Sequence, residues 1–209
     1  MADLKPLTDA IVAGDREAAA SETRNAIAAG EDPRAMLAAV VAAMAEVGER
    51  FKRKEVYVPE MLIAARAFKT ALPLLEPLLV AAGIQPEHKV VIGTVQGDLH
   101  DIGKNLVALL WRGAHFEVVD LGVNVPAEKF VDAIREHGAA AVGLSALLTT
   151  TMVGMAEIIR SIRAAGHEKV KILVGGASVT KEWASSIGAD AWAADAASAV
   201  DALRRALAS

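Results

Sequence analysis

Residues 89–121 read KVVIGTVQGDLHDIGKNLVALLWRGAHFEVVDL, and this stretch decides the fold. Two short β-branched runs, 90–92 and 116–121, flank a segment of helical length, which is typical of a parallel βαβ unit. Three further runs predict strands at 140–144, 170–174 and 191–193. The alternation of strands and helices predicts an α/β domain with a flavodoxin-like (Rossmann-like), five-stranded parallel sheet.

Four glycines stand where helices should end before the next strand, namely Gly113, Gly138, Gly166 and Gly188. Glycine is favoured at a left-handed helix C-cap because it has no Cβ. We therefore expect each of them to end a helix. The last helix is expected from about Asp195 to Leu207.

Before Gly83 the apolar residues recur at helical spacing instead. We expect four helices there, one of them beginning near Asp32 and Pro33. Pro73 and Pro77 should kink or end the last of these helices, because an interior proline costs about 3 kcal/mol.

The chain therefore divides into two predicted domains. Residues 1–86 form an N-terminal helical bundle cap, and residues 87–209 form the α/β domain. Residues 82–87 read AGIQPE and are the expected linker and hinge between them.

Composition excludes several classes of protein. Hydrophobic residues make up 54% and charged residues 23% of the 209 residues, so we expect a packed core rather than disorder. A net charge of -4 without a basic cluster argues against nucleic acid as a partner, and the absence of cysteine excludes disulfides and thiolate chemistry. The most apolar stretch, 71–84, is too short to span a membrane. With no signal-peptide pattern at the N-terminus, we expect a cytoplasmic protein.

The sequence also predicts where a ligand binds. In an open α/β sheet, ligands bind beyond the carboxyl ends of the strands, and the flavodoxin-like switch point lies between strands 1 and 3. The loops after these strands, 93–103 and 143–151, are rich in glycine, hydroxyl, acid and imidazole groups. Gly175 and Gly176 follow strand 4 and let a ligand approach the backbone closely.

Asp98 and His100 form the most informative pair in these loops. In an extended segment, residues two apart project to the same side, so Asp98 could hold one imidazole nitrogen of His100 by a hydrogen bond. The other nitrogen would then be free to bind a metal. The alternative is that Asp98 caps a loop beside a solvated His100.

Other signatures of chemistry are absent from the sequence. It contains no Walker A motif, no G-x-G-x-x-G after the first strand, no H-E-x-x-H and no G-x-S-x-G. A P-loop nucleotidase, a dinucleotide enzyme, a zinc protease and a serine hydrolase are therefore disfavoured.

Residues 98–103, DLHDIG, match D-x-H-x-x-G, the fingerprint of cobalamin-binding domains that bind with a histidine on cobalt. The rest of that pattern follows in order, as Ser145, Leu147, Thr149, Gly175 and Gly176. Upstream, 47–51 (VGERF) and 56–61 (VYVPEM) are similar to the helical cap of the cobalamin module of methionine synthase. Over nearly its whole length the chain resembles the free-standing corrinoid proteins of methyltransferase systems. These serve methylamine, methanol, glycine betaine or methoxyaromatic methyltransferases.

The resemblance implies a role for each matching residue. His100 would be the lower axial ligand of cobalt in place of the cofactor's dimethylbenzimidazole, the base-off/His-on mode. Asp98 would hydrogen-bond His100, and Thr151 would extend this relay where methionine synthase has a serine. The groove for the displaced nucleotide tail would be formed by Gly97, Leu99, Asp101, Ile102, Gly103, Ser145, Leu147, Thr149, Gly175 and Gly176, with Ala196 at the start of the last helix closing its far end. Phe51, Val58 and Met61 of the cap would cover the methyl-bearing face.

Simpler interpretations of the same residues exist. Phe51 and Met61 at helical spacing are compatible with a plain helical core. Ser145 and Thr151 could be helix N-caps. Gly175 and Gly176 could form an ordinary tight turn.

The resemblance implies a methyl carrier that is not itself an enzyme, with methylcobalamin and cob(I)alamin as its cofactor forms. Its implied partners are a substrate-specific methyltransferase, a second methyltransferase that passes the methyl group to tetrahydrofolate or a thiol coenzyme, and a reductive activator. The alternatives are an adenosylcobalamin mutase subunit, a cobalamin-dependent light sensor, and a plain flavin or phosphorelay domain. The helical cap argues against the mutase, and the absence of a basic or helix-turn-helix segment before Asp32 argues against the sensor.

Overall fold

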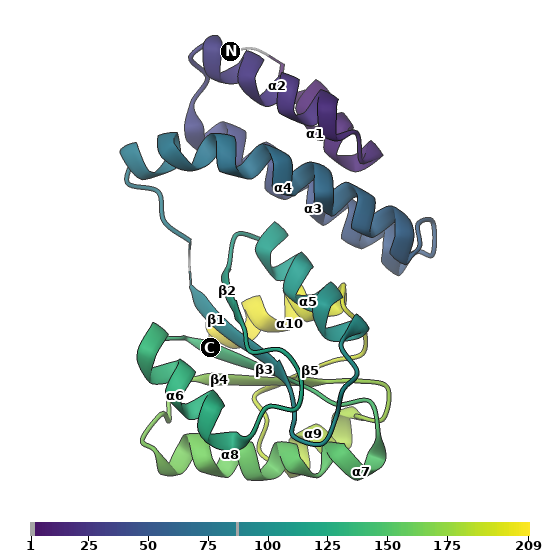
Figure 1. Cartoon of the computed structure of the whole chain (residues 1–209), viewed down its shortest axis with the longest axis vertical. Helices are drawn as coiled ribbons and strands as arrows, with labels where there is room; N and C mark the ends of the chain where they lie inside the picture. The colour runs from purple at the N-terminus through teal and green to yellow at the C-terminus, as the bar shows by residue number, and fades with distance from the viewer. Residues whose placement is uncertain (1–2, 87) are drawn as a thin grey trace. The chain divides into compact units, whose positions relative to one another are not determined.

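The structure is a computed structural model that describes residues 3–86 and 88–209. It divides into two compact units, the first holding Met1–Pro86 and Gly113–His115, the second holding Glu87–Arg112 and Phe116–Ser209. Figure 1 shows the elements of each unit. The domain boundary at residues 86 and 87 stays a prediction, because Glu87, the last residue of the expected linker, lies outside the described residues.

The first unit is helical, with α1 Lys5–Ala13, α2 Arg16–Ala28, α3 Pro33–Lys52 and α4 Val58–Ala81. Within residues 3–86 the four predicted helices are therefore confirmed. Helix α3 begins where the sequence predicts, because an Asp32 side-chain oxygen accepts the Arg34 N–H at 3.0 Å and Pro33 occupies the first helical position.

Helix α4 does not end at either of its prolines. It continues through Pro73 and Pro77, and Gly83 then adopts a left-handed φ of 68° just beyond its end. Ala71, Leu75 and Leu79 are buried, so the apolar face of the helix continues across both prolines. Burial of this face offsets the proline penalty of about 3 kcal/mol. No helix in the described parts of the chain is long and apolar enough to cross a bilayer.

The second unit is built on a parallel sheet. Its strands are β1 Lys89–Thr94, β2 Glu117–Asp120, β3 Ala141–Ser145, β4 Lys171–Gly175 and β5 Ala191–Ala193. In the described part of the chain these five strands form one all-parallel sheet in the order β2-β1-β3-β4-β5. This is the flavodoxin-like order, so the predicted fold class is confirmed.

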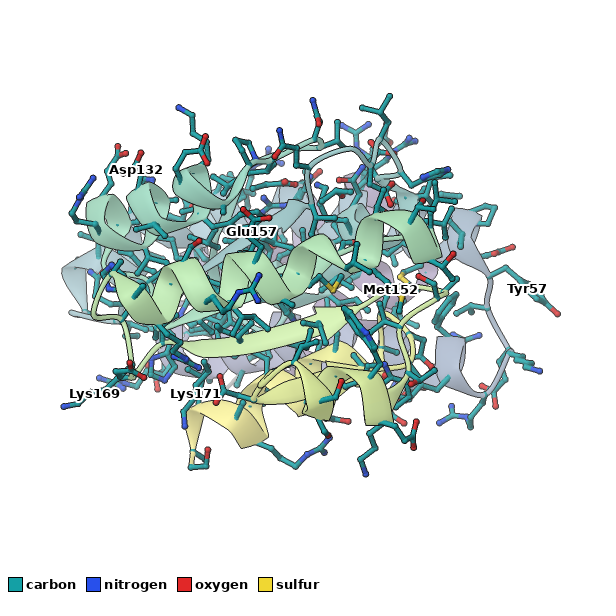
Figure 2. The ribbon with its side chains drawn as sticks, turned by 90° about the horizontal axis from the view of Figure 1, so that it is seen from below. Tyr57, Asp132, Met152, Glu157, Lys169 and Lys171 are labelled. Atoms are coloured by element: carbon teal, nitrogen blue, oxygen red, sulfur yellow. The ribbon has the colours of Figure 1, made fainter. Side chains whose placement is uncertain are left out.

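Helices cover both faces of this sheet (Figure 1). They are α5 Ile102–Gly113, α6 Ala127–His137, α7 Thr149–Met152, α8 Gly154–Ala164, α9 Lys181–Ser186 and α10 Ser198–Leu207. On one face α6 and α8 pack Phe130 and Ile159 into a core with Val142 of β3. Figure 2 views the unit from this side, with Asp132 labelled on α6. On the other face α5 and α10 meet where the Trp111 indole N–H donates to the Ala199 carbonyl at 3.2 Å.

The predicted left-handed C-caps are confirmed at three of the four glycines. Gly138, Gly166 and Gly188 have φ angles of 63°, 84° and 78°. At Gly113 the prediction is right in part, because α5 ends at this glycine, but the left-handed residue that caps it is His115, with φ 69°. The Phe116 N–H donates to the Trp111 carbonyl at 3.0 Å, so the helix is capped two residues later than expected.

The last helix also begins later than expected, at Ser198 instead of about Asp195. The Ser198 N–H donates to the Asp195 carboxylate at 2.7 Å, and the Asp195 N–H donates to the Ser198 hydroxyl at 3.2 Å. These bonds form a turn ahead of the helix, so Ala196 lies in this turn and not in the helix.

Candidate functional site

The loop after β1 holds an aspartate and a histidine in direct contact. An Asp98 carboxylate oxygen lies 2.7 Å from Nδ1 of His100. Asp98 is 1% exposed, whereas the His100 side chain is 52% exposed. An ionised carboxylate only accepts hydrogen bonds, so Nδ1 carries the imidazole proton and Nε2 carries a lone pair. No hydrogen bond to Nε2 occurs among residues 3–86 and 88–209, and this nitrogen is free to bind a metal.

The Asp98 carboxylate accepts three further hydrogen bonds. The oxygen that contacts the imidazole also accepts the His100 backbone N–H at 3.0 Å. The other oxygen accepts the Leu147 backbone N–H at 2.8 Å and the Thr151 hydroxyl at 2.6 Å. Burial by itself would raise the pKa of Asp98, but the bonds from Thr151, His100 and Leu147 together hold this pKa well below its ordinary value. The site therefore keeps a buried carboxylate anion behind the imidazole.

Thr151 and Ser145 are not helix N-caps. Thr151 lies inside α7, whose N-cap is Leu148, and its hydroxyl reaches Asp98. Ser145 is the last residue of β3. Leu147 contributes to this cluster through its backbone N–H, which no side-chain pattern could have indicated.

Asn124 fixes the loop that carries Asp98, and the sequence analysis missed it. Its side-chain oxygen accepts the Gly97 N–H at 2.8 Å, and its own N–H donates to the Asp98 carbonyl at 3.0 Å. Asn124 has a φ of 55°, in the left-handed region that asparagine tolerates better than most residues. The only signal in the sequence was an asparagine two residues after Gly122, because both residue types are frequent in turns.

Asn124→Gly should lower the free energy of unfolding by about 1 kcal/mol, because glycine keeps the left-handed backbone and the N–H but loses the acceptor for Gly97. Asn124→Ala should be less stable still, by about another 1 kcal/mol, because alanine is strained at this φ. Urea unfolding of the two variants measures both effects. An alanine variant as stable as the glycine variant would contradict the assignment of strain.

A cavity of about 290 Å³ opens beside His100, on the side of the sheet covered by α5 and α10. Its walls extend from β1 across β3 and β4 to β5, so it is wider than the predicted groove between strands 1 and 3. The predicted residues that line it are His100, Gly103, Ser145, Leu147, Gly175, Gly176 and Ala196.

Gly103 and Gly176 both line the cavity, and the missing Cβ has a different consequence at each. Gly103 lines the wall, and a Cβ built there meets no atom within 4 Å. Gly176 has a φ of 138°, and a Cβ there would collide with the Ala146 carbonyl. Gly176 therefore permits a close backbone approach that an ordinary turn does not need.

The other predicted residues do not line this cavity, because they lie on the loops around it and not on the sheet face. Leu99 and Ile102 are both 72% exposed beside His100. An Asp101 side-chain oxygen accepts the Asn105 amide at 3.0 Å at the start of α5. Thr149 begins α7, and Gly97 lies on a separate polar hollow of about 380 Å³.

The predicted cap residues belong to the first unit. Met61 is buried, whereas Phe51 and Val58 are half-buried. Their role at the methyl-bearing face stays a prediction.

Two cavity residues had no signal in the sequence. Lys104 is 3% exposed and its ammonium lies 2.7 Å from an Asp120 carboxylate oxygen. Trp111 is fully buried against the sheet. A lysine and a tryptophan in an amphipathic helix are ordinary residues, and only the packing of α5 on the sheet brings them to the cavity.

The described residues contain no cluster of three or more metal-binding side chains. A metal at Nε2 of His100 would thus take a single ligand from this part of the chain and must arrive with its other positions filled. A metal inside a macrocycle meets this requirement, and the cavity beside His100 gives room for a further part of such a cofactor.

Comparison with known proteins supports a cobalamin site in this chain. A B12 binding domain model matches residues 88–204, and a second B12 binding domain model matches residues 4–76. The chain is 40% identical to the trimethylamine corrinoid protein 1 of Methanosarcina acetivorans, covering 95% of this chain and 94% of the relative. A cobalamin-binding protein from Desulfitobacterium hafniense, known from a crystal structure, is 30% identical in sequence to this chain. The two structures superpose with a TM-score of 0.82 over 99% of both chains. The methanol:cobalamin methyltransferase complex of Methanosarcina barkeri contains a chain that is 27% identical, with a TM-score of 0.85 over 97% of this chain and 78% of that one. The chain therefore belongs to the B12-binding family of corrinoid proteins of methyltransferase systems.

Proposed function

We propose that this protein carries methyl groups on cobalamin between separate methyltransferases and is not itself a catalyst. The observation that carries the proposal is the His100 imidazole, held by a buried carboxylate at the mouth of a cavity with Nε2 free. Bound cobalamin supplies a cobalt that takes up and releases a methyl group, in the methylcobalamin and cob(I)alamin forms. The protein's part is to hold and orient this cofactor.

His100 is the proposed lower axial ligand. Asp98 fixes the proton on Nδ1, which leaves the lone pair of Nε2 available to a metal. The Asp98 carboxylate, which accepts the Nδ1 hydrogen bond, also fixes the orientation of the imidazole ring.

The names of the relatives support a methyltransferase as a partner, and the further partners are part of the proposal. One substrate-specific methyltransferase loads the methyl group, a second passes it to tetrahydrofolate or a thiol coenzyme, and a reductive activator restores inactive cofactor, all in the cytoplasm. Because one relative is a trimethylamine corrinoid protein, a methylamine is the first methyl donor to test.

The test uses the whole chain loaded with methylcobalamin. We expect the methyl group to remain when tetrahydrofolate or a thiol coenzyme is added alone, and to leave when an acceptor methyltransferase is also present, as followed in the visible spectrum. Repeated methyl transfer by the chain alone would overturn the carrier role. A chain that leaves gel filtration colourless after mixing with hydroxocobalamin would overturn the cofactor site itself.

A further inference from the structure

We propose that the inner end of the cavity selects the base of the cofactor's nucleotide tail, accepting a flat apolar base such as 5,6-dimethylbenzimidazole and disfavouring a purine. The inference rests on the proposed function, because it places the tail in the cavity beside His100. It adds a selectivity between nucleotide bases, which follows from the residues that line the cavity in this chain.

The inner end of the cavity is apolar and buried. Ile92 of β1, Trp111 of α5, Leu173 of β4 and Ala199 of α10 line it, and each is at most 4% exposed. The exposed lining residues, such as Asp195, mark the mouth. A tail that enters past His100 therefore meets its most apolar surroundings at its far end.

One wall of the inner end is an aromatic ring. A Cβ at Gly143 of β3 would collide with the Trp111 ring, so the indole lies directly against the backbone of the sheet at this glycine. The ring and the aliphatic side chains of Ile92 and Leu173 leave a site suited to a planar, apolar group.

The polar groups at the inner end already have partners. The Trp111 indole N–H donates to the Ala199 carbonyl at 3.2 Å. The Lys104 ammonium donates to both Asp120 oxygens and to the Asn105 side-chain oxygen, each at 2.7 Å, which uses its three protons.

The backbone of β3 at the inner end is also hydrogen-bonded. Gly143 is paired with Ile92 on one side and with Leu173 on the other, so the ladder occupies its peptide groups. Among the described residues that form the inner end, no donor or acceptor is unused, and the Ser145 hydroxyl of the same cavity lies two residues beyond Gly143, at the carboxyl end of β3.

This lack of free polar groups sets the selectivity. Adenine carries an exocyclic amine and ring nitrogens that lose their water on entry and find no replacement partner. The two methyl groups of dimethylbenzimidazole gain from the same burial. We expect the adenine-containing analogue of cobalamin to bind about 10- to 100-fold more weakly than cobalamin.

The test compares three ligands on the full chain by equilibrium dialysis, read from the visible absorption of the corrin. They are cobalamin, its analogue with adenine as the lower base, and cobinamide, which lacks the nucleotide tail. We expect cobalamin to bind most tightly. Equal affinity for the two bases, or cobinamide binding as tightly as cobalamin, would overturn the proposed selectivity. Failure of all three ligands to bind would instead remove the proposed cofactor site and the selectivity with it.

Trp111→Phe gives a sharper test, because it removes the indole donor from the Ala199 carbonyl and leaves that oxygen, which also accepts a helix bond in α10, with one free lone pair at the inner end. The preference for dimethylbenzimidazole over adenine should then fall about 10-fold. Trp192→Phe is the matched control, since that indole donates to the Val179 carbonyl at 2.8 Å and does not line this cavity. An unchanged preference in the first variant, or an equal fall in the control, would contradict the proposal. If Trp111→Phe fails to fold, Val107→Thr takes its place, because it puts a hydroxyl on the cavity wall at nearly constant volume. It should also lower the preference for dimethylbenzimidazole over adenine.

Discussion

His100→Ala is expected to remove imidazole coordination from the bound cofactor, and the visible spectrum of the methylcobalamin-loaded chain should shift to that of a form without a lower imidazole. We expect cobalamin binding to weaken by about 100-fold, because loss of a supporting residue alone costs 10- to 100-fold at metal sites. The fold should persist, since the His100 side chain is half-exposed. Asp98 also keeps its bonds from the residue-100 backbone, Leu147 and Thr151.

His137→Ala is the matched control for this variant, because His137 lies in the last turn of α6 and does not line the cavity. It should keep the spectrum and the affinity of the unmodified chain. Added imidazole should restore the coordinated spectrum in His100→Ala only. A spectrum unchanged by His100→Ala would remove His100 from the cobalt site.

Asp98→Asn should lower the free energy of unfolding by about 2 to 4 kcal/mol. The buried carboxylate accepts four hydrogen bonds, and an amide offers only one accepting oxygen. Whichever way the amide turns, a backbone N–H of His100 or Leu147 faces its NH₂ group and loses its partner. Denaturant unfolding measures the loss. Asp132→Asn, at an exposed ion pair on α6, is the control and should change stability by less than about 0.5 kcal/mol.

The same variant should also differ from the unmodified chain in its response to pH. The pKa of Asp98 in the folded chain lies below its ordinary value of 3.8, so the unfolded chain takes up a proton there first as the pH falls. The stability that the Asp98 anion contributes is complete above about pH 4 and decreases as the pH falls toward the folded pKa. The difference in unfolding free energy between the unmodified chain and Asp98→Asn should therefore shrink below about pH 4. A difference that grows on acidification would contradict the assignment.

The sheet could be predicted from the sequence because its strands are buried on both faces and appear as short β-branched runs. The predicted 90–92 and 170–174 lie within or overlap β1 and β4, with errors of a few residues at the ends. Errors arose where tertiary contacts outweigh local preference. Helix α4 continues through Pro73 and Pro77 because its buried face continues, and the left-handed residue that follows α5 is His115 and not Gly113.

The site could be predicted in part for a similar reason. The contact between Asp98 and His100 depends on spacing along one segment, so the sequence indicated it. The bonds from Leu147 and Asn124 depend on how the loops after β3 and β2 approach that segment. Sequence spacing carries no information about such approaches, and the same is true of the position of Trp111 in the cavity.

The bonds that hold Asp98 come from loops far apart in the sequence, and with Asn124 they fix the segment through groups of the chain itself. A disordered binding loop would lose conformational entropy on association, which would reduce affinity. Here that entropy is lost during folding, so binding energy at the imidazole is not spent on ordering the chain. Cofactor uptake at this loop should resemble docking onto a rigid surface, with a heat-capacity change that reflects buried apolar area and not coupled folding.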